Sequence, residues 1–147
     1  MHDTRTSPAR GRRGAIVTSL AMVALVLSVA RAQDLGEAQH AVAKMILDVA
    51  VVRDGLCAHL GAGDGQLTAA LASTGSLLVH GLSAEAEATK RARASITRAG
   101  LYGVAWVEQM RPERLPYSEN LVNLIVADDY LRYPTPPSEM LRVLRPG

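Results

Sequence analysis

Aromatic residues and cysteine are scarce in this chain. Its 147 residues include one Trp, four Tyr and no Phe, so the core must be built mainly from Ala, Val, Leu and Ile. The single cysteine, Cys57, excludes an internal disulfide framework and a cysteine-based zinc cluster. Four scattered His do not predict a metal site. A composition of 48% hydrophobic and 20% charged residues indicates one globular domain, neither disordered nor fibrous.

The net positive charge of the chain comes from its N-terminal segment. The chain has a net charge of +2, yet residues 1–32 alone contain five Arg and one acid, Asp3. Subtracting these leaves 11 basic and 13 acidic residues in 33–147, a net charge of −2. This remainder offers no surface for following a phosphate backbone, so we expect no nucleic-acid partner.

Residues 1–32 have the three parts of a secretory signal peptide. Three Arg between positions 10 and 13 precede an uncharged run over 14–30, and Ala30-Arg31-Ala32 matches an A-x-A cleavage site. We therefore predict export to the periplasm or cell envelope, with the membrane contacted only through this segment. The alternative is a membrane anchor over 14–30, whose 17 residues reach only the lower length limit of a spanning helix. In an oxidising compartment, Cys57 should be buried rather than reactive.

The remainder alternates between helical and strand patterns. An amphipathic helix is predicted within 33–53, and Asp54-Gly55 then predicts a turn. Its apolar positions recur at helical spacing: Leu35, Ala38, Val42, Met45, Ile46 and Val49. Strands are predicted over 56–60, 76–82, 104–108 and 121–127, and helices over 66–74, 84–99 and 138–144, with Ser83 as a helix N-cap. This alternation predicts an α/β domain over 54–147 with a Rossmann-like, doubly wound parallel sheet.

A glycine-rich turn separates the first predicted strand from the next helix. The dinucleotide fingerprint G-x-G-x-x-G fails because position 66 is Gln, which disfavours a nucleotide-binding oxidoreductase. The pattern that is present is G-x-G-x-G, at Gly61, Gly63 and Gly65, with Asp64 between the last two glycines. This loop resembles motif I of the class I S-adenosylmethionine-dependent methyltransferases, which hold the methionine part of the cofactor against it.

The resemblance extends over about 54–147. His80-Gly81-Leu82-Ser83 is similar to the family's end of strand two, and Arg114-Leu115-Pro116-Tyr117 to its approach to strand four. The run 141–147, LRVLRPG, resembles the turn before strand five. The sequence around 101–103 and 120–126 is also similar to that of exported bacterial proteins in which such a domain precedes a quinoprotein-like β-propeller.

The sequence departs from the family at three positions where acids are common. These are His59 ahead of the glycine loop, Ser83 at the end of strand two, and Arg111 (or Met110) near the adenine edge. The family's acid at position 83 would grip both ribose hydroxyls, and Glu85 is near enough in sequence to substitute in part. With the loop Gly61, Gly63, Asp64 and Gly65, these positions form the predicted S-adenosylmethionine site.

Asp128 and Asp129 follow the fourth predicted strand, where acceptor contacts are expected. They are the only catalytic candidates, and two solvated acids at a strand end explain them equally well.

The resemblance implies a seven-stranded sheet of which this sequence supplies about four strands, in the order 3-2-1-4. We therefore expect a truncated domain, or one whose strand Leu121–Ala127 associates with another polypeptide, because such apolar edges recruit partners. Two functions remain: an exported methyltransferase of unknown acceptor, or a non-catalytic binding or structural module with the same fold. The three lost acids favour the second.

Overall fold

The computed structural model describes residues 36–74 and 76–146, so the predicted signal segment and Gly75 lie outside the described residues. Residues 36–50 are helical. Seven further elements follow: β1 (Asp54–Leu60), α2 (Gln66–Thr74), β2 (Ser76–Ser83), α3 (Ala86–Arg98), β3 (Ala105–Gln109), β4 (Leu124–Ala127) and α4 (Pro137–Val143). None of the described helices is long and apolar enough to cross a membrane.

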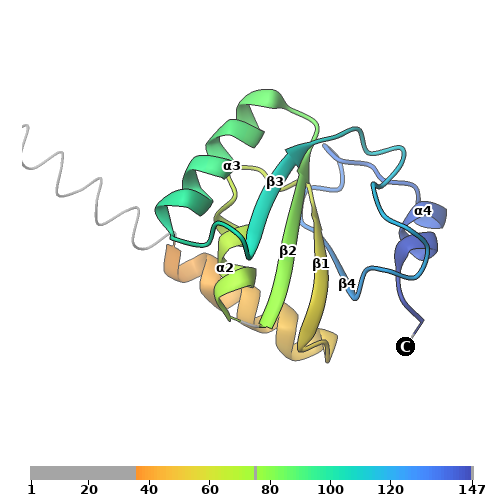
Figure 1. Cartoon of the computed structure of the whole chain (residues 1–147), viewed down its shortest axis with the longest axis horizontal. Helices are drawn as coiled ribbons and strands as arrows, with labels where there is room; N and C mark the ends of the chain where they lie inside the picture. The colour runs from red at the N-terminus through yellow and green to blue at the C-terminus, as the bar shows by residue number, and fades with distance from the viewer. Residues whose placement is uncertain (1–35, 75, 147) are drawn as a thin grey trace, which may run out of the picture. The chain divides into compact units, whose positions relative to one another are not determined.

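The four strands form one parallel sheet in the order β3-β2-β1-β4 (Figure 1). In the central register, His59 of β1 lies between Gly81 of β2 and Val126 of β4. Because all strands are parallel, their carboxyl ends meet at one edge, where ligands bind in open α/β sheets. The predicted α/β class and strand order are confirmed.

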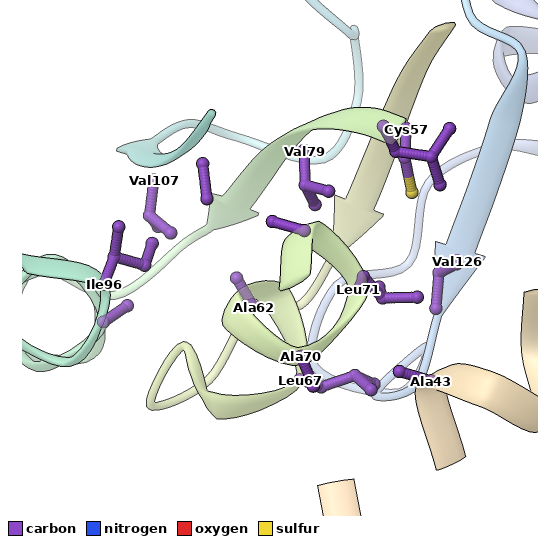
Figure 2. Close-up of a cluster of buried hydrophobic side chains, with 14 of the residues drawn as sticks. Ala43, Cys57, Ala62, Leu67, Ala70, Leu71, Val79, Ile96, Val107 and Val126 are labelled. Atoms are coloured by element: carbon purple, nitrogen blue, oxygen red, sulfur yellow. The ribbon is translucent and has the colours of Figure 1, made fainter. Parts of the chain in front are cut away.

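Each face of the sheet carries its own apolar cluster. On one face, strand residues such as Cys57, Val79 and Val126 pack against α2, α3 and the helix 36–50 (Figure 2). On the other, Leu60 and Leu82 pack against α4 and the connection 110–123. The cluster includes the small residues Ala43, Ala70 and Ala92 on its helices and no aromatic side chain.

Two strand boundaries differ from the prediction for one reason. β1 begins at Asp54, so Asp54-Gly55 is strand rather than turn, and β4 begins only at Leu124. The Asn123 side chain accepts a hydrogen bond from the Leu56 N–H at 3.0 Å and occupies the space that a Cβ at Gly55 would fill. Residues 120–122 pair instead with 142–145, including a bridge between Val122 and Leu144.

Two helix details also differ. Ser83 ends β2, and Glu85 is the N-cap of α3, so Ser83 is not the cap that the sequence predicted. The helix 36–50 buries Ala43 and Leu47, whereas Val42, Met45 and Val49 of the predicted apolar stripe are exposed. The buried stripe is rotated by about one residue, since this helix carries apolar side chains on both faces and only packing selects between them.

Candidate functional site

Three glycines with positive φ shape the turn after β1. Gly61, Gly63 and Gly65 have φ values of 82°, 51° and 80°, which lie in a region of backbone conformation that residues other than glycine rarely adopt. The Gly61 and Ala62 N–H groups both donate to the Leu82 carbonyl at 2.9 Å. The loop is thereby fixed to the end of β2 and leads directly into α2.

Two of these glycines also make room for neighbours. A Cβ at Gly61 would lie 3.2 Å from the Asp129 Cβ, and one at Gly65 would lie 2.7 Å from the Ala92 Cα of α3. Gly63 has nothing closer than 3.7 Å, the Gly61 carbonyl oxygen. Gly65 therefore allows helix packing, whereas Gly61 and Gly63 keep backbone exposed at the carboxyl ends of β1 and β4.

A cavity of about 280 Å³ lies beside this loop. Its lining comes from the glycine loop, the start of α3 and the segment after β4: Gly61, Gly63, Asp64, Ala84, Glu85, Ala88, Arg91, Asp129, Arg132 and Tyr133. The structure therefore brings together four of the predicted site residues (Gly61, Gly63, Asp64 and Asp129). Gly65, His59, Ser83, Asp128 and Arg111 are not part of its lining.

His59 is buried and connects three elements. Its Nε2 donates to the Asp128 carboxylate at 3.0 Å, and its Nδ1 lies 2.8 Å from the Thr68 hydroxyl of α2. Because an ionised carboxylate only accepts, this assignment leaves Nδ1 of the neutral ring to accept from Thr68. His59 thus ties the end of β4 to α2, and it positions the loop from behind rather than lining the cavity.

The two adjacent aspartates have different surroundings. Asp128 is held by His59, whereas Asp129 lines the cavity and its Oδ2 lies 3.5 Å from the Arg132 Nε. The Asp129 backbone carbonyl accepts from Arg132 and Tyr133 N–H groups, closing a turn over the site. Of the two catalytic candidates, only Asp129 faces the cavity.

Ser83 lies next to the site but points its hydroxyl into a local turn. The hydroxyl oxygen accepts from the Glu85 N–H and donates to the Glu85 carbonyl, both at 3.4 Å. The residue is 5% exposed. Glu85, two residues on, lines the cavity in its place.

Arg111 is exposed and is not part of the cavity lining. Its contribution to the fold is its carbonyl, which accepts from the Tyr133 hydroxyl at 3.3 Å. Burial raises the pKa of Tyr133 to about 12, so this hydroxyl remains a donor at neutral pH.

Sequence reasoning missed two cavity residues, Arg91 and Arg132. In the sequence, Arg91 belongs to the basic group of Lys90, Arg91 and Arg93, which is typical of the solvated face of a helix. The available signal is its spacing, since it lies three residues after Ala88 on α3 and therefore on the same side of the helix. Nothing in the sequence predicts the turn that places Arg132 there.

The motifs at 114–117 and 141–147 are explained by their contacts within the fold. The Arg142 guanidinium donates to the Glu139 carboxylate and to the Tyr117 carbonyl, and Glu139 accepts from the Leu115 N–H at 2.8 Å. These bonds fasten α4 to the segment before β4. Chiefly because of the hydrogen bonds from Arg142, the pKa of Glu139 falls to about 2.

Cys57 is fully buried in the first apolar cluster. Burial raises the pKa of its thiol to about 12, so it is an inert core side chain, as expected. Within 36–74 and 76–146, no group of three or more His, Cys, Asp or Glu side chains could hold a metal ion.

Comparison with known proteins identifies the family. The family model described as "Methyltransferase domain" matches residues 58–147, which is more than half of the chain. The chain belongs to this methyltransferase domain family. No protein with a curated description matches it.

Solved structures share the fold of this methyltransferase domain. A protein from Methanococcus maripaludis, named as an S-adenosyl-L-methionine-dependent methyltransferase, is 24% identical with a TM-score of 0.67, covering 72% of this chain and 50% of its own. A Galdieria sulphuraria protein named as a sarcosine dimethylglycine methyltransferase is 22% identical with a TM-score of 0.61, covering 73% and 43%. A geranyl diphosphate methyltransferase in complex with S-adenosylmethionine is 17% identical with a TM-score of 0.62, covering 74% and 46%. The chain thus spans about half the length of these proteins.

The family assignment supports S-adenosylmethionine as the cofactor. The methyltransferase domain fits this group at the glycine loop, where a Cβ at Gly61 would fill the space beside Asp129. The exposed loop backbone and the start of α3 provide donors and acceptors for a polar ligand.

Proposed function

We propose that this domain binds S-adenosylmethionine at the cavity beside Gly61 and Gly63 and presents its methyl group to an acceptor. The observation that carries the proposal is the glycine loop itself, with three positive φ values and a cavity of about 280 Å³ at the carboxyl ends of the strands. That cavity is close to the lower limit for a small-molecule site.

In this reaction the chain's own residues bind the cofactor and the acceptor and orient them toward each other. The cofactor supplies a methyl group on a sulfonium, which passes to a nucleophilic atom of the acceptor and leaves a thioether. Backbone groups of Gly61 and Gly63 would hold the methionine end, and Asp129, which lines the cavity, would accept a proton from the acceptor. No nucleophilic side chain is required, because positioning supplies most of the acceleration.

Calorimetric titration of S-adenosylmethionine into the full chain tests the proposal, with cooperative unfolding checked on the same sample. We expect saturable binding with one site per chain. A Gly61→Val variant, whose side chain meets Asp129, should abolish it, whereas Gly103→Ala, where nothing lies within 4 Å of the new Cβ, should not. A folded wild-type chain that binds no cofactor would contradict the proposal.

A non-catalytic module with the same fold is the second candidate function. It is favoured by the position of His59, where the family commonly has an acid and where both ring nitrogens are committed to Thr68 and Asp128. Under this alternative the cavity takes no cofactor and the fold serves a protein partner. The titration above decides between the two, because only the first requires binding.

We further propose that residues 1–32 direct export, in keeping with the basic segment, apolar run and A-x-A site of the sequence. The similarity to exported proteins with a quinoprotein-like β-propeller supports the same interpretation. Mass spectrometry of the chain recovered from the periplasm should give an N-terminus at Gln33. A mature protein that retains residues 14–30 in the membrane fraction would support the anchor instead.

The β4 edge is the proposed place of association for another strand. Among the described strands, β4 pairs only with β1, whereas residues 120–122 just before it pair with 142–145. Exposed strand edges of low charge recruit further strands. Ile125→Lys should reduce self-association measured by light scattering if this edge is used, and should leave it unchanged if not.

A further inference from the structure

We infer that Glu85 supplies the carboxylate that binds the ribose hydroxyls of the cofactor, in place of the residue at the end of β2. This inference rests on the proposed function and assigns a residue to it. It follows from three features of the structure: the orientation of Ser83, the position of Glu85, and the charges around the cavity.

Ser83 is poorly placed to bind a ligand. Its side chain is buried, and its hydroxyl exchanges hydrogen bonds with the Glu85 backbone in a tight turn. A ligand hydroxyl would have to compete with that turn for the same oxygen. The residue also stays outside the cavity lining, unlike its successors Ala84 and Glu85.

Glu85 is placed where the carboxylate is missing. It is the N-cap of α3 with extended backbone (φ −99°, ψ 128°), and its side chain makes no cap hydrogen bond. Its backbone carbonyl already accepts from the Thr89 N–H and hydroxyl, so the helix start does not need the carboxylate. Among the acids that line the cavity, Glu85 is the one that follows β2 in the chain.

The charges around the cavity suit a carboxylate at this wall. The lining also contains Asp64 of the glycine loop and Asp129 after β4, together with two arginines, Arg91 of α3 and Arg132. The N-terminus of α3 favours a negative charge nearby. A carboxylate that accepts from two vicinal hydroxyls forms charge-assisted bonds, which are stronger than those of a serine hydroxyl.

The test uses two probes, S-adenosylhomocysteine and its 2′-deoxyribose analogue, titrated calorimetrically into the full chain. The variants are Glu85→Gln and, as a matched control, Glu87→Gln, an acid in the first turn of the same helix that is not part of the cavity lining. We expect wild type and Glu87→Gln to bind the deoxy analogue about tenfold more weakly than the parent. Glu85→Gln should bind the parent about tenfold to a hundredfold more weakly than wild type does and should no longer distinguish the two probes.

Each contrary result has a separate meaning. If Glu85→Gln binds both probes as wild type does, the inference is overturned while the proposed function stands. If the folded wild-type chain binds neither probe, the proposed function fails, and the inference with it. Circular dichroism of the three proteins shows that each result comes from folded chains.

Discussion

Each face of the sheet buries one histidine, and the two differ in how completely they are hydrogen-bonded. His59, on the face covered by α2 and α3, uses both ring nitrogens, with Thr68 and Asp128. His80, on the face covered by α4 and the segment 110–123, uses only Nδ1, which accepts from the Tyr117 hydroxyl at 2.9 Å. Its Nε2 is buried without a hydrogen-bond partner in the described structure, 3.6 Å from the Glu108 carboxylate.

The two histidines have different roles. His59 helps to position the site, whereas His80 belongs to the face that only covers the sheet. The His59 bonds connect β1 to α2 and to the residue after β4, at the carboxyl ends of the strands. His80 instead stacks on the partly buried Trp106 of the edge strand β3, with ring centroids 4.7 Å apart. Buried polar groups that lack partners are costly, so we expect His80 to stabilise the fold less than His59 does.

The largest effect is expected where a helix touches the glycine loop. Gly65→Ala should lower the free energy of unfolding by about 2 to 4 kcal/mol, because the new Cβ meets the Ala92 backbone and φ is positive. Gly63→Ala has the same strain without the contact and should cost about 1 kcal/mol. Urea unfolding measures both. Equal losses would show that close packing at Gly65 contributes nothing.

Removing each histidine tests the comparison directly. His59→Phe leaves the buried Thr68 hydroxyl and Asp128 without their partner and should cost about 2 to 3 kcal/mol. His80→Phe keeps the stack on Trp106, loses one bond and should cost about 1 kcal/mol. Thermal or urea unfolding gives the difference. If the two variants are equally destabilised, the second nitrogen of His59 has no energetic weight.

Acid should weaken the second face through Glu139. Its pKa is about 2 in the folded chain against 4.5 as the ordinary value, chiefly because Arg142 donates hydrogen bonds to it. A depressed carboxylate pKa gives stability that is present above pH 4.5 and lost as the pH falls toward 2. Glu139→Gln should be less stable at pH 7 and should flatten this part of the curve. A variant curve parallel to that of wild type would refute the assignment.

His80 should produce a smaller loss at higher pH. Burial lowers its pKa below 6.5, an effect that Glu108 opposes in part. As the pH falls, the unfolded chain therefore binds this proton at a higher pH than the folded chain does. The free energy of unfolding keeps its full value above pH 6.5 and decreases as the pH falls below it. His80→Phe should remove this slope, while the Glu139 transition remains. Unfolding midpoints at closely spaced pH values between 7 and 5 make the comparison.

Much of the fold could be predicted from local patterns. The helix predicted over 66–74 coincides with α2, and the helix predicted over 84–99 contains α3, which ends just before Gly100 with its φ of 70°. Local propensity and packing agree in these two helices. The boundaries of β1 and β4 could not be predicted, since they depend on an Asn123 side chain that reaches a strand 67 residues away. Likewise, the buried side of the helix 36–50 is selected by its neighbours.

Local sequence patterns are enough to assign the class of the protein and to locate the loop of its site. Strand and helix periodicities with G-x-G-x-G are local features, and they lead to the α/β fold and to Gly61, Gly63 and Asp64. Which polar side chains face the cavity depends instead on the tertiary structure. It turned Ser83 inward, committed Asp128 to His59, and brought Glu85, Arg91 and Arg132 to the cavity. Side-chain direction at strand ends depends on turns and on contacts between distant residues, which spacing along the chain does not encode.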